Sequence, residues 1–152
     1  MTEPSFAPRS PRYAERVRDS FARQQVMTTF GATLVDVTPG RVVAAMPFNA
    51  ALTQQHGFLH AGVVAAVLDS ACGYAAFSLM DEDSAVLTAE FKINLLAPAE
   101  GARFRFEAQV VKSGRTLLPA EGRAYAETEG GPRLIATMSA TLMAVRGRGL
   151  DG

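Results

Sequence analysis

The sequence contains few of the residues that bind metals or form disulfides, and it has no excess of charge of either sign. Cys72 is the single cysteine, which excludes an internal disulfide and is typical of a reducing compartment. His56 and His60 are the two histidines, too few for a structural zinc site, so we expect no metal. Fifteen basic and fifteen acidic residues balance, which gives no indication of binding to nucleic acid or to an anionic membrane.

The N-terminal residues do not resemble a signal peptide. Residues 1–21 contain no continuous apolar core, so we expect a cytoplasmic protein. With 152 residues, of which 48% are hydrophobic and 20% charged, the chain is long enough for one globular domain. We expect a leader and an amphipathic helix within residues 1–29, the folded domain over 30–146 and a flexible tail over 147–152.

The longest apolar stretch runs from His60 to Met80 and predicts a helix. Small and branched apolar residues lie on all its sides, interrupted by Asp69, Ser70 and Ser78. At 1.5 Å per residue, such a helix is about 30 Å long, enough to cross a bilayer. A carboxylate at its centre makes that crossing costly, and the segments after it are typical of water-soluble strands. We therefore expect a core helix that is buried on every side.

Strands are predicted on both sides of this helix, from turn residues before it and from alternating apolar and polar residues after it. The expected strands cover residues 32–37, 41–48, 86–95, 103–112, 116–127 and 134–145, with turn residues between them. In the third strand, the alternation places two sets of side chains on opposite faces: Leu87, Ala89, Phe91, Ile93 and Leu95 on one, and Thr88, Glu90, Lys92 and Asn94 on the other. One sheet face covers only one side of a helix, so the sheet must curl and a second copy of the chain must cover the rest. This pattern predicts an α+β fold, a curled antiparallel sheet wrapped around a long central helix.

Asp69 is the first candidate for a catalytic residue. A carboxylate in an apolar helix has its pKa raised by desolvation unless donors stabilise the ion. Acids with shifted pKa values gather at active sites, which favours a catalytic role. The alternative is a carboxylate that is satisfied by backbone donors or faces a water-filled seam. Cys72 is a weaker candidate for a nucleophile, because no base is placed beside it and buried cysteines are usually inert.

The segment before the helix, residues 54–62, offers a second candidate. Backbone N–H groups of Ala61 and Gly62 at the helix start could bind a developing oxyanion, helped by the helix dipole. The alternative is an ordinary helix start with His60 as an imperfect cap. A metal site at His56 and His60 is disfavoured because no third ligand lies near them.

The spacing of several residues resembles that of a known family. An amide, a glycine, a histidine followed by a small residue and glycine, a carboxylate and a strand occur in this order: Gln54, Gly57, His60-Ala61-Gly62, Asp69 and residues 88–99. Over about residues 30–145, the sequence resembles the PaaI-type acyl-CoA thioesterases of the hotdog-fold superfamily. Two positions depart from the family pattern, since Gln54 replaces the Asn usual in the PaaI branch and Ala61 replaces a Gly.

The resemblance implies a hotdog fold and hydrolysis of acyl-CoA to free acid and CoA, without any cofactor other than the CoA of the substrate. It implies that Asp69 is the nucleophile or general base and that Gln54 orients water or substrate. The N–H groups of Ala61 and Gly62 then bind the oxyanion, and Thr88 lies near the attacking water. Contacts with substrate and CoA are implied for a further set of residues: Gly57, His60, Asn94, Lys112, Ser113, Gly114 and Arg115. For the last four, which form a turn, a plain basic hairpin tip is the alternative.

Helix geometry adds a requirement for two chains. Ala61 and Asp69 are eight residues apart, about 12 Å along the helix axis. Both must act within about 3 Å of a single thioester carbonyl, which one helix does not allow. Two antiparallel helices related by a two-fold axis meet this requirement, so we expect a homodimer with shared sites, or a dimer of dimers. An apolar tunnel between the helices would take the acyl group.

Three other functions stay open on the same fold. A non-catalytic acyl-CoA-binding module or regulator would keep the tunnel and the basic turn without needing the carboxylate. A hydratase would need a histidine paired with an aspartate, for which His60 and Asp69 are available. A structural oligomerisation domain would explain the apolar helix but not the spacing from Gln54 to Asp69. Aromatic, medium-chain and branched acyl groups would all fit an apolar tunnel.

Overall fold

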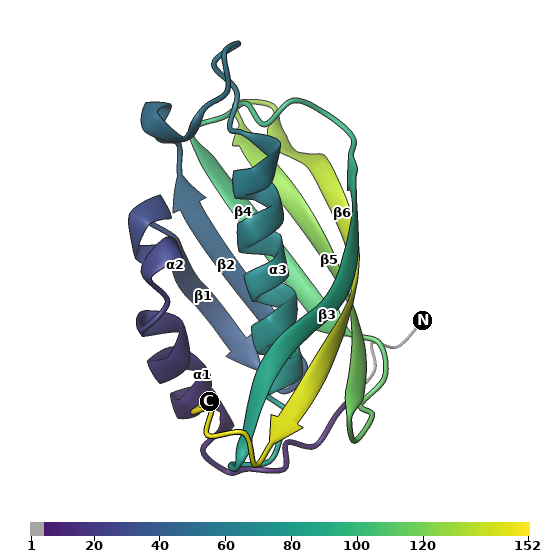
Figure 1. The fold of residues 1–152 in the computed structure, drawn as a ribbon. Coiled ribbons are helices and arrows are strands. Elements are labelled where there is room, and N and C mark those ends of the chain that lie inside the picture. The colour runs from purple at the N-terminus through teal and green to yellow at the C-terminus, as the bar shows by residue number, and fades with distance from the viewer. Residues whose placement is uncertain (1–4) are drawn as a thin grey trace.

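The structure, a computed structural model, describes residues 5–152, in which a curved sheet holds one long helix on its concave face (Figure 1). The helices are α1 (Tyr13–Ala22), α2 (Gln25–Phe30), the short 3₁₀ helix η1 (Ala50–Leu52) and α3 (Ala61–Phe77). The strands are β1 (Thr33–Thr38), β2 (Arg41–Pro47), β3 (Ser84–Leu95), β4 (Arg103–Val110), β5 (Leu117–Thr128) and β6 (Gly131–Arg146). Over these residues, all pairs are antiparallel and the strand order is β1-β2-β4-β5-β6-β3.

Helix α3 packs its apolar side against the concave face of the sheet. Leu68 and Phe77 of α3 are fully buried, as are Phe104 and Phe106 of β4 and Leu142 of β6. Along β4 and β5, buried and more exposed residues alternate with a period of two, as expected for strands with one covered face. The arrangement is an α+β hotdog fold, so the predicted fold class is confirmed.

Two helices differ from the sequence prediction. Helix α3 ends at Phe77, three residues earlier than expected, where the Ser78 hydroxyl donates to the Ala75 carbonyl and accepts a hydrogen bond from the Gly40 N–H. Helix α2 was not predicted and follows α1 almost directly, ending at Gly31 with a φ of 70°. Its six residues are too few for an apolar periodicity to be recognised.

The described residues of one chain leave one side of α3 uncovered, and this is the side that the sequence analysis expected a second copy to cover. The sheet covers one side of the helix, and α1 covers a flank, where the rings of Phe21 and Tyr74 lie 5.6 Å apart. The uncovered residues are small apart from one carboxylate: Ala61, Gly62, Ala65, Ala66 and Asp69. These residues lie on one face because they repeat at the spacing of helical turns.

Strand β3 lies at the edge of the sheet beside β6 and contains a β-bulge. Its pairing with β6 shifts between Thr88 and Glu90, so Ala89 is an extra residue. Paired residues of antiparallel strands point to the same side, and the partners of β3 place Thr88 on the concave face with Phe91. The predicted alternation, which grouped Thr88 with Glu90, is therefore wrong at the bulge.

Both ends of the described chain lack helices and strands. Residues 1–4 of the expected leader lie outside the described residues, and within residues 5–10 the side chain of Phe6 packs against the core. In the expected tail, residues 147–152, the Gly152 carbonyl accepts a hydrogen bond from the Arg23 guanidinium. None of the helices within residues 5–152 is long and apolar enough to cross a membrane.

Candidate active site

Asp69 lies on the uncovered side of α3, next to the bulge in β3. Among the described residues, its carboxylate accepts one hydrogen bond, from the Thr88 hydroxyl, with 2.8 Å between Oγ1 and Oδ1. Burial raises the pKa of Asp69, and the hydrogen bond from Thr88 lowers it in part. Thr88 reaches this carboxylate because the bulge turns its side chain to the concave face. The two residues that were predicted to act near the attacking water are thus brought together.

The start of α3 offers one free backbone donor. His60 is the N-cap, and its Nδ1 accepts a hydrogen bond from the Gly62 N–H at 2.8 Å. The N–H groups of Val63 and Val64 both donate to the His60 carbonyl. Within the described residues, the Ala61 N–H therefore has no acceptor. The prediction that Gly62 donates to an oxyanion is corrected by this geometry, because the imidazole already occupies its N–H.

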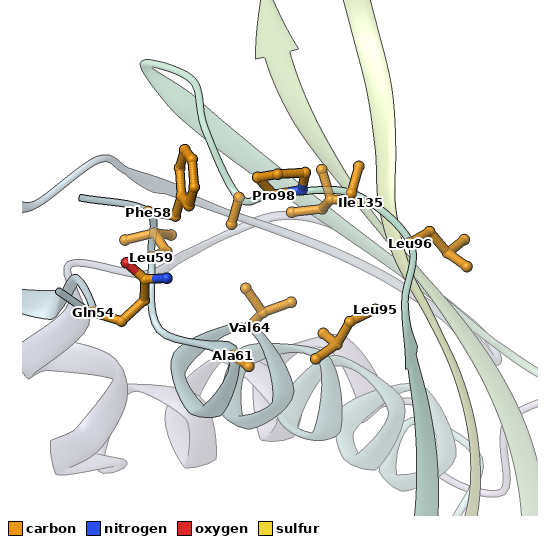
Figure 2. Close-up of a pocket in the computed structure, with 11 residues that line it drawn as sticks. Gln54, Phe58, Leu59, Ala61, Val64, Leu95, Leu96, Pro98 and Ile135 are labelled. Atoms are coloured by element: carbon orange, nitrogen blue, oxygen red, sulfur yellow. The ribbon is translucent and has the colours of Figure 1, made fainter. Parts of the chain in front are cut away.

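Gln54 lies on the loop that leads into α3. A tight turn forms there, in which the Gly57 N–H donates to the Gln54 carbonyl, and Gly57 has a φ of 85° that favours glycine. The Gln54 side-chain oxygen accepts a hydrogen bond from the His56 N–H, and Figure 2 shows the amide nitrogen turned towards the cavity. Gly57 therefore acts through backbone conformation, whereas Gln54 presents a donor.

An apolar cavity of about 440 Å³ extends from Gln54 and Ala61 to the end of β3. In Figure 2, side chains from the loop, α3, β3 and β6 surround it. They are mostly apolar and include Phe58, Leu59, Val64, Leu95, Leu96 and Ile135. A cavity of this size and lining fits a chain-like apolar ligand.

The two halves of the predicted site are separate within one chain. Gln54 and Ala61 line the apolar cavity, whereas Asp69 and Thr88 line a second cavity farther along α3. About 12 Å of helix separates Ala61 from Asp69, which is too far for both to act on one carbonyl.

Asn94 lies away from these residues. Its side-chain nitrogen donates to the Thr137 hydroxyl at 3.2 Å, and the pairing of these two residues places them on the convex face of the sheet. The neighbouring Leu95 is the one that faces the apolar cavity. This placement argues against the predicted contact between Asn94 and a substrate in the cavity.

The basic turn at residues 112–115 lies at the end of the domain where α3 ends. The Val110 N–H donates to the carbonyl of Gly40, and the Gly40 N–H is itself bonded just beyond α3. The side chains of Lys112 and Arg115 are exposed. A Cβ on Gly114 would clash with the carbonyl oxygen of Leu117 at the start of β5, so the close approach of the backbone requires glycine there. Within one chain, the turn is therefore remote from Ala61.

The sequence analysis missed a group of polar residues around Asp69. The cavity beside Asp69 measures about 140 Å³ and is also lined by Gln24 of the α1–α2 connection and by Ser70 and Tyr74 of α3. Ser70, which follows Asp69 directly in an otherwise apolar helix, was the available signal. Gln24 gave no signal, because its position beside α3 depends on how α1 packs.

Fold and site together define a hotdog domain with a carboxylate on its central helix and a free N–H at the helix start. Residues 56–132 match the sequence profile of the thioesterase superfamily. A Saccharolobus solfataricus protein named as a putative esterase is 30% identical over 97 residues, covering 64% of this chain and 69% of that protein. The chain belongs to the thioesterase superfamily, and this membership indicates a hydrolase.

Solved structures agree with this assignment. A thioesterase family protein from Silicibacter pomeroyi is 66% identical, with a TM-score of 0.87 over 89% of this chain and 99% of that one. The E. coli PaaI protein from the phenylacetic acid degradation operon is 17% identical, with a TM-score of 0.80 over 91% of this chain and 97% of that one. The second comparison shows a shared fold.

Proposed function

We propose that this protein is an acyl-CoA thioesterase, which hydrolyses the thioester of acyl-coenzyme A to free acid and CoA without a metal or redox cofactor. The observation that carries the proposal is the desolvated carboxylate of Asp69, held by Thr88 on the uncovered face of α3. Membership of the thioesterase superfamily supports the reaction type. Aromatic and medium-chain acyl groups are the substrates to examine first.

Asp69 acts either as general base or as nucleophile. As the base, it takes a proton from water while the water oxygen attacks the carbonyl carbon. As the nucleophile, its own oxygen attacks and forms an anhydride, which water then hydrolyses. In both cases the carbon–sulfur bond breaks and the sulfur leaves with the electron pair, to be protonated as the CoA thiol. A raised pKa supports the role of base, because it makes the carboxylate a stronger proton acceptor at neutral pH.

Each active site uses two chains in this proposal. When two α3 helices pack antiparallel around a two-fold axis, Asp69 of one chain faces the Ala61 N–H of the other, which binds the oxyanion together with the helix dipole. Gln54 of that other chain presents its amide to the same carbonyl or to water. The uncovered face of α3 supports this packing, because it is made of small residues that allow two helices to approach closely.

Strand β3 gives independent support for the homodimer. It is an edge strand with apolar side chains that remain exposed in one chain, Leu87 at 50%, Phe91 at 43% and Leu95 at 56%. An exposed apolar edge strand favours pairing with another chain. A second copy covers the edge and the face of α3 at once, and two such dimers would form the larger assembly.

The same packing assigns a role to the basic turn. In an antiparallel pair, the end of α3 in one chain lies near the start of α3 in the other. Lys112 and Arg115 of one chain then lie on the side of the partner's apolar cavity, where their charges suit the phosphates of CoA. Ser113 adds a hydroxyl donor to the same turn, whereas the Gly114 N–H already donates to the Lys112 carbonyl.

The test is release of free thiol from a panel of acyl-CoA thioesters by the purified protein and by Asp69→Asn. We expect the variant to remain folded and dimeric and to lose about 10²–10⁴ in kcat/KM, the range for loss of a general base. The control is Asp19→Asn, which makes the same change on the exposed side of α1 and should leave activity unchanged. Near-full activity in Asp69→Asn would refute the role of Asp69.

The same panel separates the other functions. Tight thioester binding without turnover by the wild-type protein would indicate an acyl-CoA-binding module. Conversion of an enoyl-CoA to a hydroxyacyl-CoA, detected by product analysis, would indicate a hydratase.

A further inference from the structure

The cavity beside Asp69 is small, polar and set apart from the apolar cavity at the helix start. It extends from Asp69 towards the end of α3, away from Ala61, and measures about 140 Å³. Besides Asp69 and Thr88, it is lined by polar side chains from two helical segments: Ser20 and Gln24 from α1 and the residues after it, and Ser70 and Tyr74 from α3. Asp151 and Gly152 also line it.

The polar side chains in this cavity leave donors without acceptors. The Ser70 hydroxyl donates to the Gln24 side-chain oxygen at 2.9 Å, and the Gln24 side-chain nitrogen makes no hydrogen bond to the described residues. The Ser20 and Tyr74 hydroxyls lie 3.1 Å apart and share one proton, so the other proton stays free. Ser70 and Tyr74 are buried. Ser20 and Gln24 are half-buried, so water reaches them in the free protein. A ligand that fills the cavity displaces this water, so these donors favour a ligand that offers them an acceptor oxygen.

Gly73 shows that the space itself is needed. A glycine inside a helix costs about 1 kcal/mol relative to alanine, so it needs a reason. Its φ is not in the left-handed region, and a Cβ built on Gly73 would meet no atom within 4 Å. At Gly122, by contrast, a Cβ would lie 2.8 Å from the Leu68 side chain, so packing requires that glycine. Neither backbone conformation nor packing among the described residues requires Gly73, so we take space for a ligand as the reason for this glycine.

The size of the cavity identifies which part of a thioester it can hold. At about 30 Å³ per water, it has room for about five non-hydrogen atoms. The long pantetheine arm of CoA does not fit this volume, whereas a short acyl group does. In the two-chain site, the thioester carbonyl lies beside Asp69, so an acyl group reaches this cavity directly.

We propose that the cavity beside Asp69 is the acyl site and selects short acyl groups that end in a hydroxyl or carbonyl oxygen. The proposal rests on the proposed thioesterase function and deepens it. Gln24, with the Ser20–Tyr74 pair, binds the terminal oxygen, and Gly73 provides the space. The sequence analysis expected a purely apolar tunnel for the acyl group, whereas in this proposal the end of the acyl group lies in a polar cavity. Ser20 and Gln24 precede residues 56–132, so selection by them is a property of this chain and not of the matched family segment.

The experiment compares two thioesters with the same number of non-hydrogen atoms, hexanoyl-CoA and 5-hydroxypentanoyl-CoA. They differ in a terminal methyl or hydroxyl, so their kcat/KM ratio isolates recognition of the oxygen. We expect the wild-type protein to prefer the hydroxyl substrate by on the order of tenfold or more, because hexanoyl-CoA displaces water from these donors and offers them no acceptor. Gln24→Met, which keeps the size and removes the amide, should bring the ratio close to one.

A matched control is Gln25→Met, the same change at an exposed residue one position along, which should keep the wild-type ratio. Equal kcat/KM for the two thioesters in the wild-type protein, or an unchanged ratio in Gln24→Met, would overturn the proposal while thioesterase activity itself stands. Absence of hydrolysis for every acyl-CoA tested would overturn the proposed function and this inference together.

Gly73→Ala provides a second test that does not depend on Gln24. The added methyl should lower kcat/KM for 5-hydroxypentanoyl-CoA relative to acetyl-CoA, while the melting temperature stays equal or rises because alanine favours the helix. Dissociation of the dimer, measured by light scattering, would show that the glycine serves contact between chains and would contradict its role in the cavity. An unchanged substrate ratio would contradict it as well.

Discussion

Replacing Ala61 by proline removes one N–H from the proposed site and leaves the helix intact. Proline is favoured at the first position of a helix, where its ring fits the backbone and no intrahelical bond is lost. The residue before a proline must be extended, and His60 already is, with φ −59° and ψ 137°. Because the Gly62 N–H is bonded to His60, the substitution removes the one free donor found at the helix start in the described residues.

The expected magnitude follows from the loss of a single oxyanion donor. Such a loss costs about 10²–10³ in kcat, or about 2.7–4 kcal/mol, and we expect Ala61→Pro to fall in this range with any acyl-CoA that the wild type hydrolyses. The free energy of unfolding should change by less than about 1 kcal/mol. Ala50→Pro is the control: it places proline at the first residue of η1 after Asn49, which is also extended (φ −140°, ψ 117°), and should leave kcat unchanged.

Mixing two inactive variants then tests whether the site is shared between chains. In a heterodimer of Asp69→Asn and Ala61→Pro, one of the two sites has both an intact Asp69 and an intact Ala61 N–H. After exchange of equal amounts, about a quarter of the wild-type activity should return, measured as thiol release. A mixture no more active than its parents, or a near-wild-type kcat in Ala61→Pro alone, would refute the reasoning.

Three other changes have defined outcomes. Thr88→Val removes the hydrogen bond that favours the ionised form of Asp69, so the pKa of Asp69 rises further. The acid limb of the pH profile of kcat/KM should then move to higher pH, whereas Thr88→Ser keeps the hydrogen bond and the wild-type profile. An unshifted limb in Thr88→Val contradicts this. Gly122→Ala places a methyl 2.8 Å from Leu68 and should lower the free energy of unfolding by about 1–3 kcal/mol in urea titrations; an unchanged midpoint contradicts this. Burial raises the pKa of Cys72 to about 12. Dithiobis-nitrobenzoate should therefore detect no thiol in the native protein and one thiol per chain in denaturant. Labelling of the native protein would contradict the burial of Cys72.

The main elements of the fold could be predicted because they depend on local periodicity. Turn residues indicated the first two strands and the alternation of side chains the last four, all within a few residues, and the apolar stretch indicated α3. Helix α2 and the bulge at Ala89 could not be predicted, since a six-residue helix has no period and one extra residue leaves the apolar pattern of β3 almost unchanged.

The candidate site also has residues that could be predicted from the sequence and features that could not. Asp69, Gln54 and Ala61 could be selected from their spacing. The loss of Gly62 as a donor could not, because it depends on the conformation of the His60 side chain.

By itself, the sequence determined that a carboxylate lies eight residues beyond the helix start, about 12 Å along one rigid helix and too far for both to act on one carbonyl. It also indicated a curled sheet around a central helix, because a long apolar helix followed by alternating strands has few ways to be buried. Only the tertiary structure decided that Thr88 bonds Asp69 and that Gln24 lies at a cavity beside it. Both contacts join residues far apart in the chain, and their geometry depends on a bulge and on helix packing that no local pattern encodes.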